Sequence, residues 1–178
     1  MGPNDIAYTE KNSGNCYDFG LVLNKIKNTG FATTHSASSA TTDSAAAGTA
    51  LATGVKTNNG NVGVSPTEEI LKNVTEIARE NGKLVGIVTN DDITGATPAA
   101  FATHVDSRGS TSEIARQFVE FAPDVLIGQG KYDLENDEFA GLDLSKFSTA
   151  FSFEDFKRAL NRDINCNKPF LGFFSQNT

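Results

Sequence analysis

Three short runs of apolar residues divide the chain, and each is bounded by Gly, Pro, Asn or Asp. They cover residues 84–89, 125–128 and 170–174. Their length and their flanking turn formers predict buried strands. Because the apolar residues run continuously and do not alternate with polar ones, the pattern is typical of a parallel sheet covered on both faces.

Helical patterns lie between these runs. The clearest begins after Ser65, with Pro66 at the first helical position and Glu68 completing a capping box, and it ends at Gly82. Four more helices are predicted, over residues 4–11, 44–53, 111–121 and 153–161. Alternating helices and strands predict an α/β fold whose ligands bind beyond the carboxyl ends of the strands.

Two glycine- or aspartate-containing loops resemble known binding motifs only loosely. Residues 48–57 do not have the spacing of a phosphate-binding P-loop, and the glycine-rich part follows a helix where a P-loop would precede one. Residues 133–143 carry Glu138 where a calcium-binding EF-hand loop requires glycine for its sharp turn. Both the loop 54–63 and the loop 133–143 are therefore predicted to be ordinary surface loops.

Composition limits the class of protein. With 178 residues and 38% hydrophobic residues, the chain can bury a core, and its length predicts one domain over residues 1–178. A net charge of −7 without a Lys/Arg cluster argues against a nucleic-acid partner. No run approaches the roughly 18 apolar residues of a membrane span, so none is expected. Cys16 and Cys166 are equally compatible with two thiols and with one disulfide.

The segment with the most specific chemistry is Thr-Asp-Ser-Ala-Ala-Ala-Gly-Thr at residues 42–49, which places Ser44 in the first turn of an Ala-rich helix. The first amides of a helix lack intrahelical partners and carry the positive end of the helix dipole, so this is where an anion would bind. The simpler alternative is that Asp43 or Ser44 only caps the helix. His35 and His104 are the only histidines, and isolated histidines are more often structural than ligands.

Two longer segments carry a family resemblance. TTDSAAAGTALATGVKTNNGNVGV at residues 41–64 and ATPAAFATHVDSR at residues 96–108 resemble, in order and in spacing, two segments of the alkaline phosphatases. KPFLGFF at residues 168–174 resembles a further strand of that family. The resemblance implies a three-layer αβα fold with a mostly parallel sheet, alkaline-phosphatase-like and incomplete in this chain.

The resemblance also implies a reaction, the hydrolysis of phosphate monoesters through a phosphoserine intermediate. Ser44 would be the nucleophile, Arg108 would hold the phosphate, and Asp43 would orient the arginine. A serine hydroxyl needs a base or a metal to become a good nucleophile, and no Ser/His/Asp pattern is evident, so activation by a metal is expected. The family uses two Zn²⁺ ions for this purpose, one of them bound to the oxygen that corresponds to Ser44.

A third metal, Mg²⁺, is implied by Thr97, which corresponds to the hydroxyl ligand of that site in the family. Taken alone, a threonine before a proline only shapes a turn. Two residues earlier the family carries an acidic residue or histidine, whereas this chain has Gly95, so the identity of the third metal stays open. Asp91 and Asp92 could compensate in space, but they are interpreted as surface carboxylates.

Most of the family's zinc ligands have no counterpart here. We therefore expect the chain to be an N-terminal portion of such an enzyme, without its C-terminal half and inactive by itself. The resemblance implies that the whole protein acts outside the cytoplasm, in the periplasm, secreted or at the cell surface, on small phosphate monoesters and as a homodimer. The alternative is a non-catalytic module in which Ser44 and Arg108 hold phosphate or another oxyanion without metals.

Overall fold

The structure is a computed structural model that describes residues 26–28, 30–130, 138–161 and 168–174. The chain divides into two units, residues 1–33 and 34–178, and the fold described below belongs to the second. The predicted helix over residues 4–11, Cys16 and Cys166 lie outside the described residues. The single domain that the length predicts stays a prediction.

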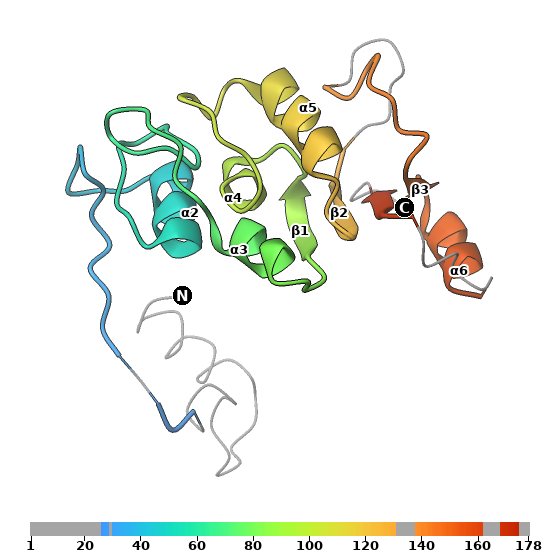
Figure 1. Cartoon of the computed structure of the whole chain (residues 1–178), viewed down its shortest axis with the longest axis horizontal. Helices are drawn as coiled ribbons and strands as arrows, with labels where there is room; N and C mark the ends of the chain where they lie inside the picture. Colours follow the sequence, from blue (N-terminus) through green and yellow to red (C-terminus); the bar gives the residue numbers. More distant parts are fainter. Residues whose placement is uncertain (1–25, 29, 131–137, 162–167, 175–178) are drawn as a thin grey trace, which may run out of the picture. The chain divides into compact units, whose positions relative to one another are not determined.

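Among the described residues, four parallel strands form the sheet, β1 (Gly86–Asp92), β2 (Val125–Gln129), β3 (Ser148–Ala150) and β4 (Phe170–Phe173). Their order is β1-β2-β4-β3, with β4 paired to β2 on one side and to β3 on the other (Figure 1). The three predicted strands and their parallel arrangement are thus confirmed. β3 was not predicted, because its three residues, Ser-Thr-Ala, contain no apolar run.

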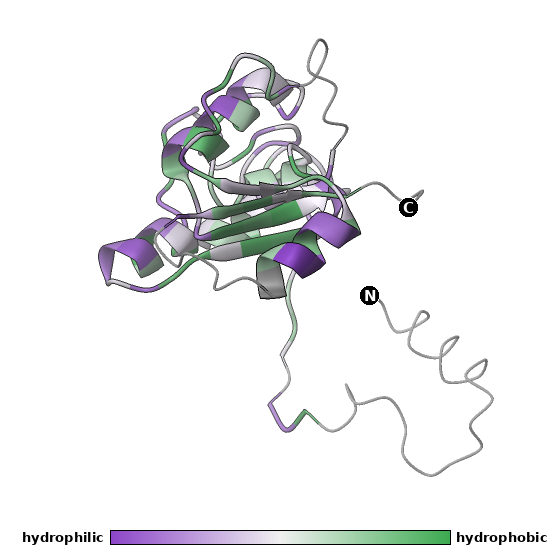
Figure 2. Ribbon diagram, turned by 90° about the vertical axis from the view of Figure 1, so that its right-hand side faces the viewer, coloured by the Kyte–Doolittle hydropathy of each residue, from purple (hydrophilic) through white to green (hydrophobic). Residues whose placement is uncertain are grey.

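The interior of the sheet follows from its hydrophobic residues, which colour the central strands in Figure 2. All of β4 is buried, and Leu126 of β2 lies in the same core as Ile114 and Phe118 of the helix α5 (Thr111–Phe121). On β1 only one face is covered, since Ile87 is buried while Val88 is 69% exposed. The prediction of cover on both faces is therefore wrong for β1, because the side chain of Val88 on the second face stays largely exposed to solvent.

Five helices accompany these strands in the described part of the chain. They are α2 (Ser44–Thr53), α3 (Val74–Glu80), α4 (Ala96–Ala99), α5 (Thr111–Phe121) and α6 (Phe153–Asn161). The predictions for α2, α5 and α6 are confirmed with their bounds. α2 ends where Gly54 adopts a left-handed conformation at φ 79°, which glycine adopts without strain.

The helix predicted after Ser65 begins elsewhere, so this prediction is wrong at its start. Ser65 closes a tight turn, in which its hydroxyl accepts hydrogen bonds from the amides of Thr67 and Glu69. α3 begins only after Asn73, whose side chain and that of Glu76 form a reciprocal capping box. Ser65 and Asn73 both carry a capping pattern, and each could start a helix. The helix starts at Asn73 because Val64 and Ile70 form an antiparallel bridge, which keeps the backbone between the two caps out of a helix.

The loop 54–63 is exposed at Gly54, Val55 and Asn59 but buried at its end, over residues 61–63, so the prediction of an ordinary surface loop is wrong for that end. Val62 pairs with Val105 in an antiparallel bridge, so this loop connects the two segments that carry the family resemblance. Gly63 has a φ of 64°, and a Cβ atom at this position would lie 2.1 Å from the carbonyl oxygen of Thr103. Only glycine fits this close approach. The loop 133–143 lies partly outside the described residues; Glu138 accepts a hydrogen bond from the hydroxyl of Thr94.

Candidate active site

Ser44 is the first residue of α2, and its side chain is exposed while the body of the helix is buried. The helix starts here because Asp43 is extended and its Oδ1 accepts a hydrogen bond from the amide of Ala46 at 2.9 Å. The small residues of α2, mostly alanine and glycine, allow its body to pack closely against neighbouring backbone. The predicted cap is therefore present, and it leaves the serine hydroxyl at the open end of a buried helix.

Arg108 comes from the second resembling segment and reaches this helix end. Its Nη1 lies 2.8 Å from Ser44 Oγ and 3.4 Å from Asp43 Oδ2. Its side chain is 46% exposed, so the guanidinium meets solvent as well as the serine. The structure thus brings together three of the four predicted site residues, although Arg108 and Ser44 are 64 positions apart in the sequence.

Asp43 performs two tasks at once. Besides capping α2 through Oδ1, it accepts a hydrogen bond from the amide of Gly60 at 3.0 Å through Oδ2, the same oxygen that faces Arg108. Gly60 in turn accepts a hydrogen bond from the backbone amide of Arg108 at 2.8 Å. The backbone of Gly60 therefore links the carboxylate to the arginine. Sequence reasoning missed this link, because a glycine in a loop gives no signal of its backbone contacts.

Thr97 lies on α4, which packs directly on α2. A Cβ atom at Gly48 would lie 3.0 Å from Ala100 Cβ and 3.6 Å from Thr97 Cα. Gly48 follows Ser44 by about one helical turn, so the absence of a side chain at Gly48 lets Thr97 approach the helix that carries the serine. The side chain of Thr97 is exposed.

The surroundings of Gly95 bear on the metal expected there. A Cβ atom at Gly95 would lie 3.2 Å from Asp91 Oδ2, so the Asp91 carboxylate occupies space that a side chain at position 95 would need. Asp91 and Asp92 are exposed, as predicted. The Asp91 carboxylate and the Thr97 hydroxyl are hard oxygen donors of the kind that Mg²⁺ prefers.

Zinc has different requirements. Among the described residues, no group of three or more His, Cys, Asp or Glu side chains could hold a metal ion. The part of the chain that the structure describes therefore does not by itself fit two zinc ions.

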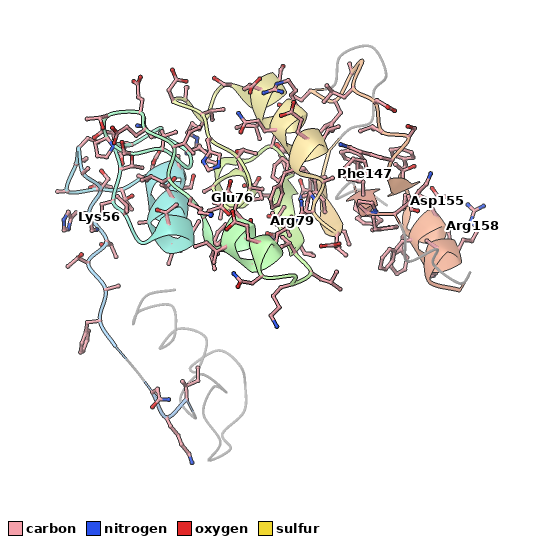
Figure 3. All side chains as sticks on the ribbon, viewed as in Figure 1. Lys56, Glu76, Arg79, Phe147, Asp155 and Arg158 are labelled. Atoms are coloured by element: carbon pink, nitrogen blue, oxygen red, sulfur yellow. The ribbon has the colours of Figure 1, made fainter. Side chains whose placement is uncertain are left out.

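His104 has a structural environment. Its Nδ1 lies 2.7 Å from the carbonyl oxygen of Gly63, and its Nε2 lies 3.1 Å from Glu76 Oε1. Its backbone amide donates to the side chain of Gln117, whose own amide group donates back to the His104 carbonyl. Figure 3 labels Glu76 on α3, beside Arg79. These contacts tie α3 and α5 to the loop 54–63 and engage both ring nitrogens.

Comparison with known proteins agrees with this arrangement. The family model described as alkaline phosphatase matches residues 6–139. "Alkaline phosphatase 4" of Bacillus subtilis is 39% identical over 140 residues, which cover 75% of this chain and 30% of the relative. "Alkaline phosphatase" of Schizosaccharomyces pombe is 38% identical over 196 residues, which cover 98% of this chain and 36% of the relative. The chain thus spans about a third of the length of these relatives.

Solved structures give the same result. The alkaline phosphatase of a psychrophilic Shewanella species matches with a TM-score of 0.82 and 27% identity over 98% of this chain and 43% of its own. A His-to-Asp mutant of the TAB5 alkaline phosphatase, solved with Mg bound in its M3 site, matches with a TM-score of 0.71 and 28% identity over 94% of this chain and 49% of its own. The expected alkaline-phosphatase-like α/β fold is confirmed, and the chain belongs to the alkaline phosphatase family.

Proposed function

We propose that this chain carries the nucleophile and the phosphate-holding arginine of a metal-dependent phosphomonoesterase. The observation that supports this most is the 2.8 Å contact between Arg108 Nη1 and Ser44 Oγ at the N-terminus of α2. A phosphate placed at the serine would meet the guanidinium and the positive end of the helix together.

The proposed reaction has two displacements. Ser44 Oγ attacks the phosphorus, and a new O–P bond forms while the ester P–O bond breaks and the alcohol leaves with a proton. Water then attacks the phosphoserine, which releases inorganic phosphate and restores the hydroxyl. In both steps Arg108 can hold two phosphate oxygens with its planar fork, and Asp43 keeps the guanidinium at the serine.

The cofactors belong to the same proposal. Family members depend on metals, and we assign two Zn²⁺ ions and one Mg²⁺ to the whole protein, with Ser44 among the zinc ligands and Thr97 among the magnesium ligands. Bound metal ions would activate the serine hydroxyl and stabilise the leaving oxygen. The chain contains only two histidines, whereas a catalytic zinc takes about three protein ligands. We therefore propose that the 178 residues alone do not hydrolyse phosphate esters.

The family supports a proposal for substrate, location and assembly. We propose small phosphate monoesters as substrates, an extracytoplasmic location and a homodimer for the whole protein. Within the described residues, no helix has the length and apolar character needed to span a membrane.

A second function is favoured by one specific observation. Arg108 Nη1 already lies 2.8 Å from Ser44 Oγ at the N-terminus of α2. A non-catalytic module that binds phosphate or another oxyanion would need only these groups. Zinc dependence separates the two functions, because only the phosphomonoesterase requires it.

The test is a chimera of Bacillus subtilis Alkaline phosphatase 4 in which the matching segment is replaced by that of this chain. We expect zinc-dependent hydrolysis of p-nitrophenyl phosphate, and a loss of at least about a thousandfold in kcat/KM with Ser44→Ala. Ser107→Ala, next to Arg108, serves as the matched control and should keep the activity within about threefold. A zinc-loaded, folded chimera that stays active with Ser44→Ala would refute the proposal.

A further inference from the structure

A tight turn after α2 returns to the start of the same helix. The amide of Asn61 donates to the carbonyl oxygen of Asn58 at 3.1 Å and closes this turn. The side chain of Asn59, which lies within it, contacts the backbone on both sides of Thr42. Its Oδ1 accepts from the amide of Asp43 at 3.1 Å, and its Nδ2 donates to the carbonyl oxygen of Thr41 at 3.0 Å.

This pair of contacts requires the asparagine amide. The amide supplies one acceptor and one donor at the end of a short side chain, so it can bind a backbone N–H and a backbone C=O together. A carboxylate of the same shape would still accept from Asp43 but would oppose the oxygen of Thr41. Alanine would supply neither contact.

The turn is itself held to the segment that precedes the site. The backbone amide of Asn59 donates to Ser38 Oγ at 2.9 Å, and the carbonyl of Thr57 accepts from the amide of Ala37 at 2.8 Å. Thr57 is buried. The backbone of Asn59 is therefore held by hydrogen bonds, and this allows its side chain to fix the backbone at residues 41–43.

Gly60, the next residue of the turn, contacts both Asp43 and Arg108. Gly60 donates to Asp43 Oδ2 at 3.0 Å and accepts from the amide of Arg108 at 2.8 Å. Two consecutive residues of one turn thus hold the backbone before the serine, the carboxylate beside it and the backbone of the arginine.

We propose that Asn59 is a positioning residue that fixes Ser44 relative to Arg108 for phosphate binding. This proposal rests on the proposed function, because it assumes that the pair receives phosphate. Asn59 acts through Asp43 and Thr41 and does not itself need to touch the phosphate.

The experiment compares Asn59→Ala with Asn58→Ala in the 178-residue chain by NMR. Asn58 is the matched control, because it lies in the same turn and its side chain donates only to the carbonyl of Pro66 at 3.2 Å, away from the site. The first readout is hydrogen exchange of the Asp43 amide without phosphate. The second is titration with inorganic phosphate, followed through the amide of Ala46 and the Nε–H of Arg108.

We expect Asn59→Ala to accelerate exchange of the Asp43 amide by about tenfold or more and to raise the phosphate Kd by about three- to tenfold. Asn58→Ala should change both by less than about twofold. Asn59→Asp provides the conservative variant. It should retain most of the protection of the Asp43 amide, because the acceptor oxygen stays in place, and a general loosening of the loop would not produce this difference.

Equal exchange of the Asp43 amide in the Asn58 and Asn59 variants would overturn the inference, and so would unchanged phosphate affinity in Asn59→Ala. If the unaltered chain does not bind phosphate at all, the proposed function loses its support. In that case the inference also fails as a statement about phosphate, while the exchange data still report whether Asn59 fixes the backbone before Ser44.

Discussion

The neighbouring helices α2 and α3 are held in place by different means. α2 buries Ala45, Ala46, Gly48, Thr49 and Ala52, whereas α3 buries none of its residues. α3 depends instead on polar contacts, namely its capping box, the contact of Glu76 with His104, and Arg79, whose Nη2 donates to the carbonyl of Ala122 at 2.8 Å. The helix that carries the serine is thus positioned by close packing of small residues, and its neighbour is positioned by hydrogen bonds.

The largest loss of stability is expected from a substitution of Gly63, which contacts α2 directly and contacts α3 through His104. Its amide donates to Thr49 Oγ1 of α2 at 2.9 Å, and its carbonyl accepts from His104. In Gly63→Ala the new Cβ would lie 2.1 Å from a backbone oxygen at a φ of 64°. We expect a loss of about 3 kcal/mol or more in the free energy of unfolding, measured with urea.

Gly54→Ala is the control for Gly63→Ala. It has a similar φ of 79° but meets no atom within 4 Å, so it isolates the conformational strain at about 1 kcal/mol. Equal losses in the two variants would contradict the importance of the close approach.

The packing of α2 is tested by Gly48→Ala. Alanine improves helix propensity, but its Cβ would lie 3.0 Å from Ala100 Cβ and would push α4 away. We expect a net loss of about 1 to 2 kcal/mol in urea unfolding, with shifted NMR signals at Thr97. Leu51→Ala, at a position that is 78% exposed, should change stability by less than about 0.5 kcal/mol. A stabilised Gly48→Ala protein would show that α4 can move at no cost.

The polar support of α3 is tested by Asn73→Ala. The Asn73 side chain accepts from the amides of Thr75 at 3.1 Å and Glu76 at 3.0 Å. Their loss should lower the free energy of unfolding by about 1 kcal/mol. Val74→Ala, at an exposed position, should have a smaller effect. If both variants unfold at the same urea concentration, the cap contributes nothing to α3.

The smallest expected effect is on the pH dependence of stability, through Glu113 of α5. Hydrogen bonds from Arg116 and then from Gln117 lower the pKa of Glu113 from 4.5 to about 2. Since the folded-state pKa lies below the unfolded value, this stabilisation is present above about pH 4.5 and is lost as the pH falls towards 2. The side chain is 40% exposed, so solvent screening keeps the effect small.

Urea unfolding between pH 5 and pH 2.5 measures this dependence. Glu113→Gln should flatten it relative to the unaltered chain, whereas Glu69→Gln, at an exposed position, should leave it unchanged. A steeper dependence in Glu113→Gln would contradict the assignment.

The sequence predicted those parts of the molecule that depend on local signals. The bounds of α2 follow from Asp43 and Gly54, and the meeting of Ser44 with Arg108 followed from the family resemblance. The start of α3 could not be predicted, because Ser65 and Asn73 both carry capping patterns and only backbone pairing of residues 64 and 70 decides between them. The roles of Asn59 and Gly60 depend on contacts between residues distant in sequence, which no local pattern records.

The contacts of the loop 54–63 with distant segments limit where this chain tolerates added length. Surface loops usually accept insertions, but here Asn59, Gly60, Val62 and Gly63 each have a partner fixed by register, so one extra residue would displace all of them. The turn at Gly82 differs, because the amides of Gly82 and Lys83 donate only locally, to carbonyls of α3, Gly82 is exposed, and a Cβ atom there would meet nothing within 4 Å. A peptide tag or a fluorescent domain should therefore be inserted at residues 81–83. These residues follow α3 in the sequence, whereas the segment that supports the serine precedes it.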